Sequence, residues 1–90
     1  MQKIIHSGYN VGYFEHSKFK ELMTHIGAEN LCDYSEQHRF DISIWLLDNT
    51  IINYKHFHHL NPPTTIYLHG DKTTFSSIET KISEALLKYA

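Results

Sequence analysis

The sequence predicts an α+β fold, a two-layer sandwich in which two helices cover one face of an antiparallel sheet of three to five strands. Residues 40–69 contain three short runs rich in β-branched and aromatic residues, separated by two turn signals. A helical pattern of apolar residues precedes these runs at 17–26, and another follows them at 73–89. The expected order is therefore β(β)αβββα, in a single domain that spans residues 1–90.

The bracketed second strand comes from the N-terminal segment. Residues 3–6 are β-prone, and the turn-forming residues 7–10 separate them from a second β-prone run at 11–14. These features fit either one strand followed by a loop or a hairpin, and we favour the hairpin.

Each helix is predicted by an apolar stripe and by residues suited to its ends. The stripe of the first helix consists of Phe19, Leu22, Met23 and Ile26. Ser17 can cap this helix at its N-terminus, and Gly27 can end it in a left-handed conformation. The stripe of the second helix consists of Phe75, Ile78, Ile82, Ala85, Leu86 and Tyr89, with Thr73 or Thr74 as its cap. The segment 28–37 between the first helix and the strands is polar, and we expect it to be irregular.

The register of the first two strands of residues 40–69 decides which side chains face the helices. Phe40, Ile42, Ile44 and Leu46 alternate along the first strand and share one face. Asp48 and Asn49 mark a tight turn, but a loop of only these two residues would place Asn53 and Lys55 beside that face. A loop longer by one residue would place Ile52 and Tyr54 there instead. We therefore expect the longer loop, since it creates one continuous apolar face for the helices.

A different assignment of residues 50–60 leads to an alternative fold. If this segment were helical, the order would become βαβαβα around a small parallel sheet. The β-branched and aromatic residues at 51–54 favour the strand.

Composition narrows the classes of function. The net charge of −2 argues against a nucleic-acid or anionic-membrane partner. The single cysteine, Cys32, cannot form an intramolecular disulfide, which is typical of a reducing compartment. No run approaches the ~20 apolar residues of a membrane span, and the N-terminus does not resemble a signal peptide. We expect a cytoplasmic protein.

The sheet face opposite the helices is the main candidate for function. On the expected register it carries Trp45, Lys55, Phe57, Tyr67 and His69, together with Asp41, Ser43 and Asn53. Aromatic residues mixed with a few polar groups are typical of protein interfaces. The sequence offers no catalytic constellation and requires no cofactor. It therefore predicts a small non-catalytic interaction or regulatory protein that binds another protein or a second copy of itself.

A histidine cluster supports an alternative from another class. His56 and His58 are two residues apart on a strand and project from the same face, as two ligands of a zinc ion can. His69 is expected to point away, so His38 or a carboxylate such as Asp41 would supply the third ligand. This alternative is a metal-binding protein or small metalloenzyme. A third reading gives the same histidines a pH-sensing role.

Overall fold

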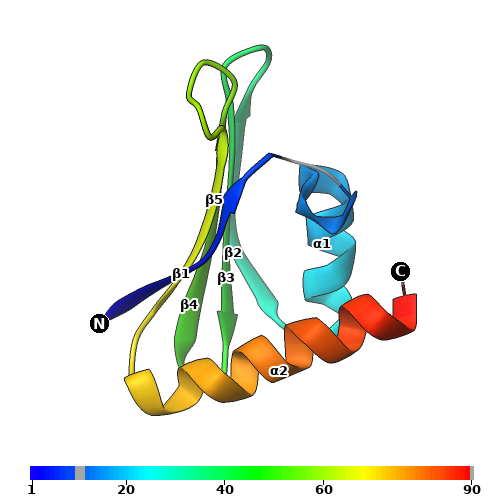
Figure 1. Cartoon of the computed structure of the whole chain (residues 1–90), viewed down its shortest axis with the longest axis vertical. Helices are drawn as coiled ribbons and strands as arrows, with labels where there is room; N and C mark the ends of the chain where they lie inside the picture. Colours follow the sequence, from blue (N-terminus) through cyan, green and yellow to red (C-terminus); the bar gives the residue numbers. More distant parts are fainter. Residues whose placement is uncertain (10–11, 90) are drawn as a thin grey trace.

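The computed structural model is a five-stranded antiparallel sheet with two helices on one face, which confirms the expected fold class (Figure 1). It describes residues 1–9 and 12–89, apart from the side chain of Tyr89. The elements in chain order are β1 (Gln2–Gly8), the 3-10 helix η1 (Gly12–Phe14), α1 (His16–His25), β2 (Glu29–Glu36), β3 (Phe40–Leu47), β4 (Thr50–Phe57), β5 (Thr64–His69) and α2 (Lys72–Tyr89). The strand order across the sheet is β1-β5-β4-β3-β2.

The central meander is confirmed. β3, β4 and β5 occupy the three expected runs, and each pairs antiparallel with the next. The alternative βαβαβα order is wrong, because the segment that it required to be helical is β4, the central strand. Its β-branched and aromatic side chains suit a strand with neighbours on both sides.

The N-terminal hairpin is wrong, because β1 is the only strand among the described residues of this region. β1 crosses the molecule to pair with β5 at the edge of the sheet. Val11 lies outside the described residues, but Gly12–Phe14 form η1 rather than a strand. Tertiary contacts account for this difference. The Phe14 ring stacks on His6 with centroids 3.8 Å apart, and the Phe14 carbonyl accepts a 2.7 Å hydrogen bond from the Tyr54 hydroxyl.

The fifth strand, β2, comes from the segment expected to be irregular. All eight of its residues are exposed, and it pairs only with β3. An edge strand that buries no side chain needs no apolar alternation, so the sequence pattern gave no sign of it. Its strand conformation is held by the backbone hydrogen bonds that β3 offers on its free side.

The helices lie where expected, but two of the three capping predictions are wrong. α1 begins at His16, before the expected cap Ser17, whose hydroxyl donates to a Glu15 carboxylate oxygen instead. Gly27, with φ 83°, ends this helix as predicted. The cap of α2 is Asp71 rather than Thr73 or Thr74, since its carboxylate accepts a 3.0 Å hydrogen bond from the Thr73 amide.

The turn between β3 and β4 contains only Asp48 and Asn49, so the expected longer loop is wrong. Both residues have positive φ, 50° and 61°, as a type I′ turn requires. This turn pairs Leu47 with Thr50 and Trp45 with Ile52. The inward face of β3 is therefore the opposite of the one expected, and Trp45 and Leu47 face the helices.

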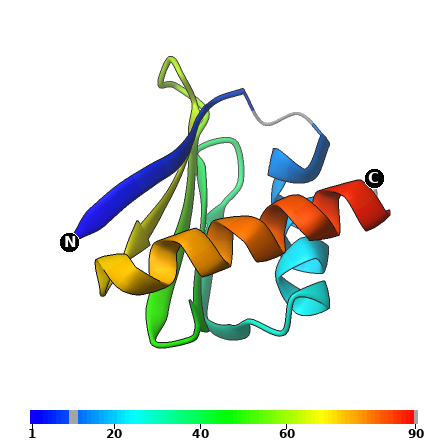
Figure 2. The ribbon, with the colours of Figure 1, turned by 60° about the horizontal axis from the view of Figure 1, so that its bottom comes forward.

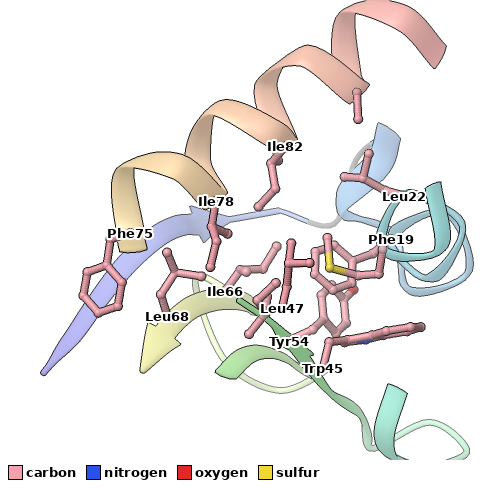
Figure 3. Close-up of a cluster of buried hydrophobic side chains, with 13 residues drawn as sticks. Phe19, Leu22, Trp45, Leu47, Tyr54, Ile66, Leu68, Phe75, Ile78 and Ile82 are labelled. Carbon is pink, nitrogen blue, oxygen red and sulfur yellow. The ribbon is translucent and has the colours of Figure 1, made fainter. Parts of the chain in front are cut away.

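The core fills the space between the sheet and the two helices (Figure 3). The sheet contributes Trp45, Leu47, Ile52, Tyr54, Ile66 and Leu68. The helices contribute Phe19, Leu22, Met23, Phe75, Ile78, Ile82 and Ala85. Both helical stripes thus pack on the sheet as predicted, apart from Tyr89, whose side chain lies outside the described part of the chain.

Candidate interaction surface and histidine cluster

The sheet face opposite the helices, here called the outer face, is open across all five strands. Both helices lie on the other side of the sheet, and no other element of residues 1–9 and 12–89 covers it (Figures 1 and 2). β3 contributes Phe40, Ile42, Ile44 and Leu46 to this face, and β4 contributes Ile51, Asn53, Lys55 and Phe57. β5 contributes Thr65, Tyr67 and His69, while the edge strands add Ile4, Cys32 and Tyr34.

Four of the five residues predicted to bind a partner lie on the outer face. Lys55, Phe57, Tyr67 and His69 are there because they alternate with the buried residues of β4 and β5. Lys55 places its ammonium 5.2 Å from the centroid of the Tyr67 ring, a cation–π contact between neighbouring strands.

Trp45 is the exception, because it belongs to the core. Its side chain is 5% exposed, and its indole N–H donates a hydrogen bond to the Ser43 hydroxyl. Asp41 and Ser43, also expected on the outer face, point inward with it, whereas Asn53 lies on the outer face as expected. The cause is the two-residue turn, which reverses the faces of β3 relative to the expected register.

The residues that replace Trp45 on the outer face make it more apolar than predicted. Phe40, Ile42, Ile44 and Leu46, here called the β3 stripe, run the length of β3 and are half-buried by their neighbours on the sheet. The positive-φ preference of the Asp48-Asn49 turn is the sequence signal that could have placed them there.

An aromatic row crosses one end of the outer face. The ring of Tyr34, which is 60% exposed, stacks on Phe40 with centroids 5.4 Å apart. Phe40 in turn lies 6.0 Å from Phe57, and Phe57 lies 6.2 Å from His59. The row therefore joins β2, β3 and β4 and adds aromatic contact area beside the β3 stripe.

A histidine cluster lies on the helix side of the sheet, where β4 ends and α1 begins. The His56 and His58 rings meet edge to face at 4.5 Å. The Asp41 carboxylate lies 3.7 Å from His16 Nδ1 and 3.9 Å from His58 Nε2. His69 lies on the outer face, as predicted, away from this cluster.

Burial keeps two of these imidazoles neutral near pH 7. It lowers the pKa of His16, with a further lowering from Lys20 that outweighs the opposing effect of Asp41. The pKa of His56 is lowered by burial and by the neighbouring His58. His56 Nδ1 is 2.8 Å from the Thr64 hydroxyl, a hydrogen bond that fixes the ring.

His16 has the least satisfied of these rings. It stacks on Tyr54, with centroids 5.2 Å apart, and its Nε2 is buried without a hydrogen-bonding partner among the described residues. Protonation at this nitrogen would leave a charged donor without an acceptor, which reinforces the preference for the neutral form.

The zinc alternative gains part of a ligand set. The rings of His56 and His58 are in contact. The third candidate ligand beside them is the carboxylate of Asp41, not the imidazole of His38. In the part of the chain that the structure describes, however, no group of three or more His, Cys, Asp or Glu side chains is arranged to hold a metal ion. Metal binding at His56 and His58 stays a prediction, which a zinc titration of wild-type protein and His56→Ala would test.

Comparison with known proteins gives no family for this chain. No protein-family model, no curated protein and no solved structure matches it. Within the described residues, neither helix is long and apolar enough to span a membrane.

Proposed function

We propose that this protein is a non-catalytic interaction or regulatory protein that binds another protein through its outer face. One observation carries the proposal: the β3 stripe lies on an uncovered sheet face. Burying such a stripe against a partner would remove apolar surface from water, which is the main driving force for protein association. The single cysteine supports a reducing, cytoplasmic setting for this interaction.

Three strands, β2, β3 and β4, form the part of the outer face that carries the β3 stripe and the aromatic row. With strands about 4.8 Å apart, β2, β3 and β4 together are about 14 Å wide. With a rise of about 3.3 Å per residue, they are about 26 Å long. This footprint of roughly 360 Å² includes the charged side chains of Glu29, Glu36 and Lys55, and the β3 stripe is its apolar centre. The aromatic row at one end supplies residues of the type that dominate interface energetics.

The test compares the loss of apolar side chains on the outer face with the loss of one apolar side chain on the helix side. The double variant Ile42→Thr/Ile44→Thr makes the β3 stripe polar while keeping β-branched residues that suit a strand. The matched control is Leu87→Gln, which removes an 87% exposed apolar side chain from α2, on the helix side. Circular dichroism and thermal melts establish that each variant is folded before binding is compared.

The readout is capture of proteins on immobilised wild-type protein and on both variants, with a second, differently tagged copy included among the candidates. We expect at least one protein that wild type and Leu87→Gln retain and the double variant loses. Retention of the same proteins by all three, or no retention by any, would contradict the proposal.

A further inference from the structure

We propose that the occupant of the outer face is a second copy of this chain, packed sheet on sheet about a two-fold axis that runs along β3. This inference rests on the proposed function and adds the identity and orientation of the partner. It is carried by the distribution of charge and apolar surface that the register places on the outer face.

The charges of the outer face are separated by the β3 stripe. Lys55 lies on β4, to one side of the stripe. Glu36 is paired across from Phe40, and Glu29 across from Leu46, so both carboxylates lie on β2 at the other side. Arg39 contacts Glu36 at 3.1 Å, but this pair is on the surface, where ion pairs are weak and readily exchanged. The face therefore has a basic flank with Lys55, an uncharged centre, and a flank on which two carboxylates and the Arg39 guanidinium leave a net charge of −1.

An axis along β1, β2 or β5 leaves the β3 stripe of each copy without a strand opposite it. Of the aligned packings with an axis along β3, along β4 or across the strands, only the first avoids opposing like charges. An axis along β4 places Lys55 over Lys55 of the second copy, since that residue lies on the axis strand. An axis across the strands places β2 over β2 in the opposite direction, with Glu29 against Glu36. Like charges that face each other across an interface are costly.

An axis along β3 gives the opposite result. It places β4 of each copy over β2 of the other, because these strands flank β3 on its two sides. Lys55 and Tyr34 both pair with Ile42, one from each side, so Lys55 of one copy faces Tyr34 of the other. Glu36 of the other copy lies one side-chain repeat further along β2. A lysine over an aromatic ring and near a carboxylate is favourable on both counts. The β3 stripe meets itself at the centre of the interface.

The area predicts a weak dimer rather than a permanent one. Three strands of each copy face each other, so the buried area is about twice the roughly 360 Å² of projected surface, or somewhat more because side chains interdigitate. Such a total is at or below the low end for specific interfaces, and transient dimers occupy that range. We therefore expect a monomer–dimer equilibrium that depends on concentration.

Analytical ultracentrifugation of the whole chain tests the proposal at concentrations up to roughly 1 mM, which reaches contacts of millimolar Kd. We expect wild type and Leu87→Gln to form dimers, and Ile42→Thr/Ile44→Thr to stay monomeric. Dimers that survive the double variant would place the contact elsewhere and overturn the proposal. A monomeric wild type would also overturn it, but would leave the proposed function to be decided by the capture of a different protein.

A charge exchange tests the axis. Lys55→Glu brings a carboxylate near Glu36 of the second copy, and Tyr34→Lys brings an ammonium opposite Lys55, so each should weaken the dimer about tenfold. In the combined variant the exchanged charges face each other, and we expect recovery to within about threefold of wild type. If the two losses simply add, the axis does not run along β3 and the proposal fails. An axis along β4 would be recognised by little response to Lys55→Glu, since one like-charged pair replaces another.

Discussion

Replacing two consecutive residues, Ile44 and Trp45, tests the register on which the whole description of the surface depends. Trp45 is 5% exposed and faces the helices, whereas Ile44 is half-buried on the outer face. Trp45→Ala removes a fully packed indole, and substitutions of this kind cost about 3–5 kcal/mol. It also removes the donor to the Ser43 hydroxyl, which has no exposure to water.

The expected cost of Ile44→Ala is smaller. The side chain is only partly removed from water and leaves no enclosed cavity, so we expect about 1 kcal/mol. For comparison, a chain of 90 residues is stable by about 5–13 kcal/mol in total. Trp45→Ala should therefore remove a large fraction of the stability, and Ile44→Ala a small one.

Urea unfolding followed by far-ultraviolet circular dichroism measures both values. Fluorescence cannot serve for this comparison, because Trp45 is the only tryptophan. A larger loss of free energy for Ile44→Ala than for Trp45→Ala would refute the register, since it would mean that Ile44 faces the helices. The wild-type protein gives an independent check: the emission of Trp45 should be blue-shifted and poorly quenched by acrylamide.

Three further outcomes follow from local geometry. Asn49 has φ 61°, so Asn49→Val should lower the free energy of unfolding by about 1–2 kcal/mol, while Asn49→Gly should be neutral or slightly stabilising. Equal stability of the two variants in urea unfolding would contradict the positive φ of this turn. Tyr54→Phe removes the hydroxyl that donates to the Phe14 carbonyl and should cost about 1–2 kcal/mol, and a cost near zero would mean that this bond contributes nothing. The pKa values of His16 and His56 are lowered in the folded state, so the unfolded chain binds protons more readily once the pH falls below the ordinary value of 6.5. Stability should be complete above that pH and decline below it, with a shallower decline in His56→Gln; thermal melts that do not change between about pH 7.5 and pH 5.5 would contradict this expectation.

Sequence reasoning identified most of the fold because the strongest patterns came from elements that bury side chains. The apolar stripes of both helices and the β-branched runs of the meander each had one consistent interpretation. β2 and the N-terminal region were missed for a different reason. β2 buries nothing, and η1 forms because Phe14 is fixed by contacts with residues distant in the sequence.

The sequence predicts the outer-face residues of β4 and β5 but not those of β3, and the error has a single physical origin. Lys55, Phe57, Tyr67 and His69 were placed correctly, because their position depends only on alternation along β4 and β5. The sequence misplaces Trp45, because the more apolar face of β3 is not the buried one. The turn geometry at Asp48 and Asn49 decides which face is buried, and it leaves an aliphatic stripe on the open side of the sheet.

The charges of β2 also bear on how the molecule stays dispersed in solution. A free strand edge eight residues long can recruit the same edge of another molecule and start a growing aggregate. If β2 paired antiparallel with itself about its centre, Glu29 would stand opposite Glu36 at both ends of the new ladder. Near neutral pH this repulsion opposes edge-to-edge growth. Without these two charges the exposed edge would lose its protection against fibre-like stacking.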